Sequence, residues 1–104
     1  MSGYPTAISI SELEQVLFLA LEALKRQYGL QGQIPLTQDF YWSIPEDQLY
    51  NVDEEPSELT IGQLSEDSQI LKEGLARGIL GFDLLKASHL LRYISHTHPT
   101  LDLF

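Results

Sequence analysis

Three histidines near the end of the chain, His89, His96 and His98, are the side chains whose type best suits a metal ion. His89 and His96 fall on one face of a helix with their Cα atoms roughly 10 Å apart, because a helix rises about 1.5 Å per residue. Chelating pairs on helices usually stand four residues apart, as in H-E-x-x-H. One ion would strain to reach both rings, so the sequence predicts no metal site and no other cofactor.

Three glycines precede a predicted helix and suggest a phosphate-binding loop. They are Gly74, Gly78 and Gly81. Such a loop needs a Lys and a Ser or Thr after its last glycine. Here Phe82 and Asp83 follow instead, and a carboxylate at that point repels phosphate. The glycines are therefore interpreted as a flexible connector between two helices.

No motif typical of a catalytic nucleophile occurs in the sequence. The serines lack a G-x-S-x-G setting. The acids from Asp53 to Glu55 occupy a polar stretch, where nothing shifts a carboxyl pKa as catalysis requires. The chain has no cysteine, which excludes thiolate catalysis, disulfides and Cys-ligated zinc. The sequence predicts no catalytic residue and favours a protein that is not an enzyme.

Aromatic and acidic residues gather in the middle of the chain, and they are the candidate binding residues. They are Tyr41, Trp42, Glu46, Asp47, Tyr50, Asp53, Glu54 and Glu55. Aromatic side chains anchor protein interfaces, and they also cover hydrophobic cores. Both interpretations remain open at this point, with Trp42 or Tyr41 as the anchor under the first.

The charge of the chain is strongly negative, with 6 Lys and Arg against 15 Asp and Glu and a net charge of −9. No Lys or Arg occurs between Arg26 and Lys72, a span that holds nine acids. Such a surface repels nucleic acids and anionic membranes, whose binding depends on basic side chains. It suits a basic protein partner, and it also suits a solvated loop with no partner.

The fold class is predicted to be mainly α, as a single domain over residues 1–104 with a loose tail at 1–7. Three principal helices are expected near 10–28, 61–77 and 83–97 around one core. Two capping boxes predict where the first two helices begin. They are Ser9 with Glu12 and Thr60 with Gln63. The irregular segment between them contains at most a short strand near 39–44, which on its own would have nothing to pair with. A helical turn or two is expected near 45–50.

Apolar residues follow a helical spacing in the expected second helix, over Ile61, Leu64, Leu71, Leu75 and Ile79. Ser68 falls inside this stripe, so either the helix breaks there or a small residue is needed. Further apolar residues lie off the main stripes of the first and third helices. They predict a homodimer through Phe18, Leu21, Phe82, Leu85 and Tyr93.

The longest unbroken apolar run, Val16 to Leu21, is far shorter than the ~20 residues that cross a bilayer. The first residues contain no basic region followed by an apolar one, so no signal peptide is expected. The protein is therefore expected in the cytoplasm, without a membrane partner.

The string YWSIPEDQLY, followed by EPSELTIGQLSED and later by LLRYI, resembles a group of small uncharacterised bacterial proteins. The resemblance covers residues 39–95. It implies a bacterial, cytosolic, helical domain and transfers no activity. The position of Ser68 is often Trp in such proteins, so this chain departs from the pattern there.

The function predicted from the sequence is a non-catalytic interaction or regulatory protein, with an acidic surface for a basic partner. The alternative is a small-molecule-binding protein or small hydrolytic enzyme, with its pocket under the 40–50 segment. Convergent buried polar groups in a pocket would favour the alternative. A flat acidic surface with exposed aromatic residues would favour the interaction protein.

Overall fold

The computed structural model describes residues 7–100, which leaves all but the last residue of the predicted tail at 1–7 outside the described range. The described residues form four helices and one two-stranded sheet, so the predicted mainly α class is confirmed. The described residues form two units, residues 7–35 with 98–100, and Leu36–Thr97. Each unit is described by itself.

The first unit contains the helix α1, Ile10–Tyr28, with the bounds predicted from its sequence. Ser9 caps its start, because the Ser9 hydroxyl accepts a hydrogen bond from the Glu12 backbone N–H at 3.1 Å. Gly29 ends it at a φ of 90°, a left-handed conformation that favours glycine. Within the same unit, the Tyr28 hydroxyl hydrogen-bonds His98 Nε2 at 2.7 Å.

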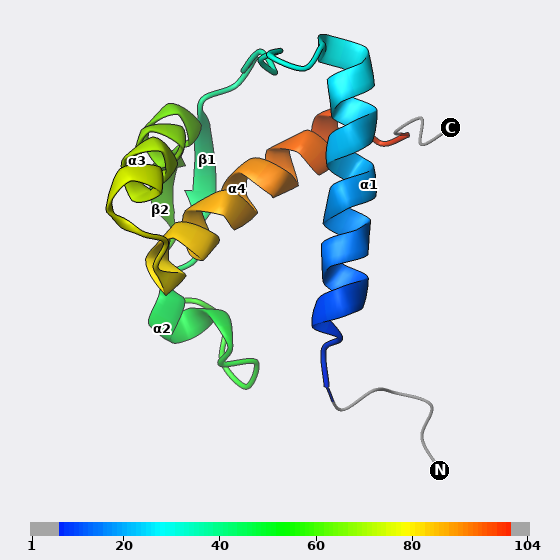
Figure 1. Cartoon of the computed structure of the whole chain (residues 1–104). Coiled ribbons are helices and arrows are strands. Elements are labelled where there is room, and N and C mark those ends of the chain that lie inside the picture. The colour runs from blue at the N-terminus through cyan, green and yellow to red at the C-terminus, as the bar shows by residue number, and fades with distance from the viewer. Residues whose placement is uncertain (1–6, 101–104) are drawn as a thin grey trace. The chain divides into compact units, whose positions relative to one another are not determined.

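The second unit is built around a two-stranded antiparallel sheet, here called the ribbon, formed by β1 (Phe40–Ser43) and β2 (Thr60–Gln63). The helix α2 (Glu46–Leu49) follows β1, where a helical turn was predicted near 45–50. The helices α3 (Leu64–Arg77) and α4 (Gly81–Thr97) complete the unit. Figure 1 shows α4 crossing the ribbon, with α3 beside it.

The predicted start of the second principal helix near residue 61 is wrong. Thr60 to Gln63 form β2, and the helix begins at Leu64. Thr60 therefore does not cap a helix. The strand near 39–44 does find a partner, with Trp42 opposite Ile61 and Tyr41 opposite Gly62.

Asp39 supplies the cap that the sequence assigned to Thr60. The Asp39 carboxylate accepts hydrogen bonds from the Ser65 backbone N–H at 2.7 Å and from the Ser65 hydroxyl at 2.9 Å. It also accepts one from the Gln63 side-chain amide at 2.8 Å. These bonds satisfy donors at the first turn of α3 and join that turn to the residue before β1.

The buried face of α3 differs from the apolar stripe read from the sequence. Leu64, Asp67 and Gly74 are buried, whereas Leu75 and Ile79 are exposed. Ser68 lies on the exposed side of an unbroken helix, so neither explanation offered for it is needed. The stripe failed because a buried carboxylate and a glycine occupy core positions that the pattern assigns to large apolar residues.

The connection from α3 to α4 is held by an ion pair rather than left flexible. The Arg77 guanidinium donates to both carboxylate oxygens of Asp83, at 2.7 and 2.9 Å. Asp83 also accepts from the Leu80 backbone N–H at 2.7 Å and is only 1% exposed. A Cβ on Gly74 would lie 3.0 Å from this carboxylate, so the glycine leaves the room that Asp83 occupies.

Acid should weaken the fold through Asp39 and Asp83. Hydrogen bonds from Ser65 lower the pKa of Asp39, and the Arg77 guanidinium lowers the pKa of Asp83. A carboxylate with a lowered folded pKa stabilises fully above its unfolded pKa of about 3.9, and loses that contribution as the pH falls through the folded pKa. Urea unfolding should therefore show the free energy of unfolding falling below about pH 4.

The double variant Asp39→Asn and Asp83→Asn provides the comparison. Neither amide titrates, so the loss of stability with falling pH should be clearly shallower in the double variant than in the parent chain. Equal slopes in the two proteins would contradict the assignment to these carboxylates.

Candidate binding site

The ribbon has two unlike faces because successive side chains of a strand point to opposite sides. Tyr41 lies on the face toward the helices. Its hydroxyl donates to Asp67 Oδ2 on α3 at 2.5 Å and lies 2.6 Å from His89 Nδ1 on α4. The ring packs over Gly62, where any Cβ would collide with it. Tyr41 therefore joins the ribbon to both long helices.

Asp67 is the centre of this polar group and is 2% exposed. Besides the Tyr41 hydroxyl, its carboxylate contacts His89 Nδ1 at 3.1 Å and Lys86 Nζ at 3.4 Å. No buried side-chain polar atom of the described residues lacks a hydrogen-bond partner. The group, Tyr41, Asp67, Lys86 and His89, is therefore a satisfied network, here called the Asp67 network.

The protonation of the Asp67 network follows from its geometry. Burial, followed by the hydrogen bond and the charge of Asp67, raises the pKa of Tyr41 above its ordinary value. The phenol thus keeps its proton and donates it to Asp67. Its oxygen is then free to accept from His89, which assigns the proton of a neutral His89 to Nδ1 and leaves Nε2 as the acceptor.

The other face of the ribbon is apolar and open. Phe40, Trp42 and Ile61 are exposed to 67, 66 and 65%, and together they are called the outer ribbon face. Trp42 lies directly opposite Ile61 in the sheet register. A tryptophan with this much exposure does not cover a core, and the role of Trp42 as an anchor stays a prediction. Tyr41, in contrast, is engaged in the Asp67 network.

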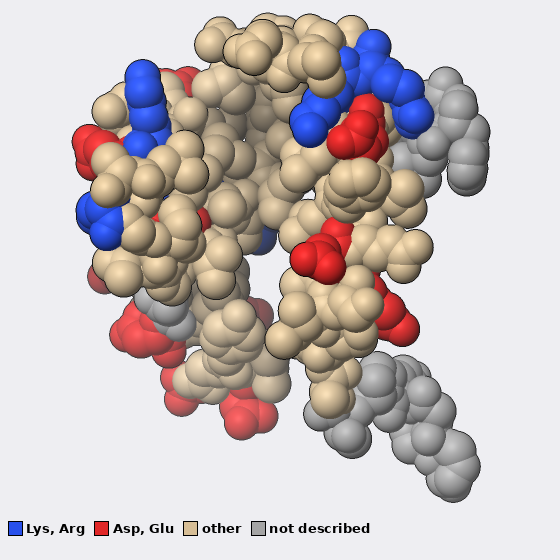
Figure 2. Space-filling model, viewed as in Figure 1, with Lys and Arg blue, Asp and Glu red and all other residues tan. Residues whose placement is uncertain are grey.

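The remaining predicted site residues lie on α2 and on the loop after it. Asp47 and Tyr50 are exposed, and every residue from 51 to 60 is exposed as well, Asp53, Glu54 and Glu55 included. Glu46 begins α2, and its side chain lies outside the described part. The side chain of Gln48 closes the loop by accepting from the Ser57 backbone N–H at 2.8 Å. Figure 2 shows acidic side chains gathered over α2 and this loop.

A hollow of about 510 Å³, here called the Trp42 pocket, lies beside the 40–50 segment. Its lining includes Trp42, Leu49, Ile61, Leu85 and Lys86. Ser88 also lines it, but its hydroxyl donates to the Leu85 carbonyl of its own helix at 2.5 Å. The hydrolytic alternative stays a prediction.

Sequence reasoning missed Asp67, Lys86 and Arg92 as site residues, and it considered His89 only as a metal ligand. Asp67, Lys86 and His89 form the Asp67 network with Tyr41, and Arg92 lines the Trp42 pocket. One signal was available, because Lys86, His89 and Arg92 recur at a spacing of three along a predicted helix and so share a face. No group of three or more His, Cys, Asp and Glu side chains suited to a metal ion occurs within residues 7–100.

The residues predicted to form a homodimer do not all reach the surface. Phe18, Leu21 and Phe82 are exposed and Leu85 is half-buried. Tyr93 is 8% exposed, and its hydroxyl accepts from the Thr37 backbone N–H at 2.8 Å, so its assignment to an outer face is wrong. The homodimer itself stays a prediction.

Comparison of the chain with family models, curated proteins and solved structures finds no match. The resemblance stated from the residues alone therefore stays an expectation. Within the described part, no helix is both long and apolar enough to cross a membrane.

Proposed function

We propose that this chain is a non-catalytic cytoplasmic interaction protein that binds a basic protein partner through the outer ribbon face and the acidic loop at 51–58. The observation that carries the proposal is the exposure of Trp42, 66%, beside an equally exposed Ile61. Soluble proteins rarely leave such apolar groups together in water unless they serve in binding. Tryptophan is also among the commonest anchors of protein interfaces.

The charge of the loop that leads into β2 selects the partner. Asp53, Glu54, Glu55 and Glu58 are all exposed on the loop that leads into β2, and no Lys or Arg occurs between Arg26 and Lys72. A surface of one sign attracts a partner of the opposite sign and speeds its encounter. An accessory or inhibitor subunit that masks a basic surface fits this arrangement.

The test begins with affinity capture from the native organism and measures the kinetics of the captured partner. Trp42→Ala should abolish capture while the free energy of unfolding stays within about 1 kcal/mol of the parent, because the side chain is mostly exposed. Reversal of Asp53, Glu54 and Glu55 to Lys should lower the association rate constant by about tenfold or more at low salt, and by less at about 0.15 M salt.

A second triple charge reversal, made away from the proposed surface, is the control for net charge. Glu14, Glu22 and Glu73 lie elsewhere on α1 and α3, and their change to Lys alters the net charge by the same amount. If the association rate constant falls equally in both triple variants, the effect is due to net charge and not to this surface. Capture that survives both Trp42→Ala and the loop reversal would refute the proposed surface.

A further inference from the structure

The basic side chains of α4 all lie on one face of that helix. They are Lys86, His89, Arg92 and His96, and their spacing of three, three and four residues matches the helical repeat. This alignment, called the basic stripe, stands out in a chain whose net charge is −9. The only other basic residues of the second unit are Lys72 and Arg77, both on α3.

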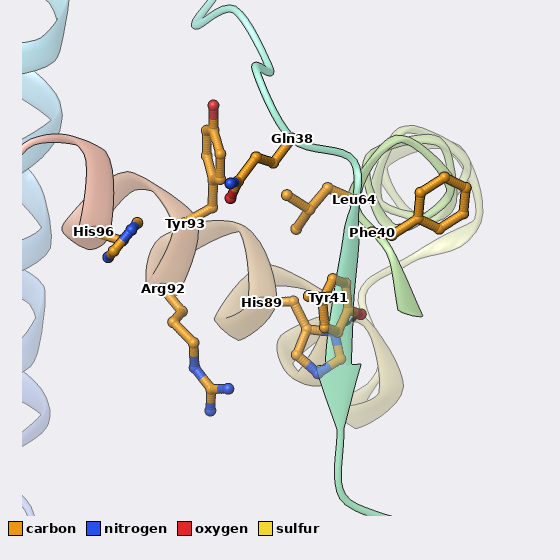
Figure 3. A pocket seen from close by; sticks show the side chains of 8 residues that line it. All are labelled: Gln38, Phe40, Tyr41, Leu64, His89, Arg92, Tyr93 and His96. Atoms are coloured by element: carbon orange, nitrogen blue, oxygen red, sulfur yellow. Dashed lines mark hydrogen bonds between the residues drawn. The ribbon is translucent and has the colours of Figure 1, made fainter. Parts of the chain in front are cut away.

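The basic stripe lines two hollows between α4 and the ribbon. The Trp42 pocket includes Lys86, His89 and Arg92. A second hollow of about 250 Å³, called the Tyr93 pocket, includes His89, Arg92 and His96 (Figure 3). Arg92 therefore stands where the two hollows adjoin. In Figure 3 its side chain and that of His89 extend to the same side of α4.

The members of the stripe differ in what already binds them. Lys86 and His89 both contact the Asp67 carboxylate, which offsets the charge of Lys86 and accepts from the His89 ring. The side chains of Arg92 and His96 make no hydrogen bond or ion pair with another residue in the range 7–100. An unpaired guanidinium beside a hollow is a ready partner for an anion, because its planar fork matches the two oxygens of a carboxylate.

The walls of the Tyr93 pocket indicate the size and polarity of the ligand apart from its anionic group. Leu64, Phe40 and the rings of Tyr41 and Tyr93 line it, so its surface favours an apolar or aromatic body. Its volume of about 250 Å³ lies just below the range of roughly 300–1,000 Å³ usual for drug-sized ligands, which indicates a small molecule. The acidic charge of the chain repels polyanions, and this favours a ligand with a single negative charge.

We infer that the Tyr93 pocket binds a small aromatic or apolar monocarboxylate, with Arg92 as the carboxylate anchor and His96 as a further donor. The inference does not depend on the basic partner proposed above, because its anchors Arg92 and His96 lie on α4. Phe40 is the one lining residue that the Tyr93 pocket shares with the outer ribbon face.

An NMR titration of the full chain tests the site with three probes of about 20 mM or less. Benzoate carries both the anion and the ring, benzamide replaces the carboxylate with a neutral amide, and inorganic phosphate lacks the apolar body. Benzoate should shift the backbone amide signals near Tyr41, Arg92 and His96 with a Kd in the millimolar range. Benzamide and phosphate should each bind at least about tenfold more weakly.

Two substitutions assign the anchor. Arg92→Gln should weaken benzoate binding by about tenfold or more, whereas Lys72→Gln, which removes an exposed cation from α3, should leave it unchanged. Arg92→Lys keeps the charge without the fork and should give an intermediate affinity. Each variant is compared through its own NMR spectrum, which reports whether the fold is retained.

Three outcomes would overturn the inference. Benzoate at the highest concentration could leave the pocket signals unshifted, or benzamide could bind as well as benzoate. If phosphate binds as tightly as benzoate, the site attracts anions in general and does not recognise the apolar body. Benzoate affinity that is the same in folded Arg92→Gln or Arg92→Lys protein as in the parent would remove Arg92 as the anchor.

Discussion

Replacing Asp67 with alanine should lower the free energy of unfolding by about 3 kcal/mol. The carboxylate is 2% exposed, and it is the shared partner of Tyr41, Lys86 and His89. Its removal leaves the Lys86 ammonium without a counter-charge and the Tyr41 hydroxyl without an acceptor. Breaking a buried ion pair costs about 3–5 kcal/mol. The lower end applies because Lys86 and His89 side chains keep 21 and 13% exposure and regain some hydration.

Urea unfolding followed by circular dichroism measures this loss, and two variants bracket it. Asp67→Asn still accepts a hydrogen bond from Tyr41 but loses the charge that faces Lys86, so its loss should be smaller than that of Asp67→Ala. Glu66→Ala removes the neighbouring exposed acid and should change stability by no more than about 0.5 kcal/mol. A loss below about 1 kcal/mol for Asp67→Ala would show that the network contributes little.

The second large effect is expected at Gly62, where alanine should cost about 3 kcal/mol, the upper end of the range for overpacking. Gly62 has no positive φ, so its backbone alone would accept alanine. The obstacle is the Tyr41 ring, which the new Cβ would overlap. The ring has no free direction of escape, because its hydroxyl is held by Asp67 and His89.

A double-mutant cycle with Tyr41→Ala isolates this clash. Once the ring is gone, Gly62→Ala should cost less than about 0.5 kcal/mol, and the two substitutions should therefore show a strong interaction energy. Thermal or urea unfolding of the four proteins provides the values. Additive losses would mean that Gly62 matters for a reason other than its contact with Tyr41.

The elements that were predicted correctly are those whose signals are local in the sequence. The bounds of α1 follow from Ser9 and Gly29, both next to the helix they delimit. The start of α3 was misplaced because its cap, Asp39, stands 26 residues before Ser65. Thr60 to Gln63 satisfied a local capping pattern, yet pairing with Phe40 to Ser43 determined their conformation. Tertiary pairing thus overrode a local signal.

The candidate site divides in the same way. Exposed acids in the loop at 51–58 could be read directly from composition. The contacts of the Asp67 network join residues that stand 19 to 48 positions apart, and no short motif indicates such contacts. The alternation of a strand places Tyr41 and Trp42 on opposite faces, but the sequence does not say which face meets the helices. Gly62, where a Cβ would overlap the Tyr41 ring, was a clue to that face.

The hydrogen bond between Gln48 and Ser57 gives the acidic loop an unusual freedom to evolve. It closes the base of the loop between residues nine positions apart, and the residues within it are exposed. The entropy of closing a loop grows only with the logarithm of its length, and doubling the length costs only about 0.6 kcal/mol. Insertions, deletions and charge changes between Val52 and Pro56 can therefore accumulate while the ribbon and helices persist. Under the proposed function, the charge that selects a partner can therefore change while the fold is kept.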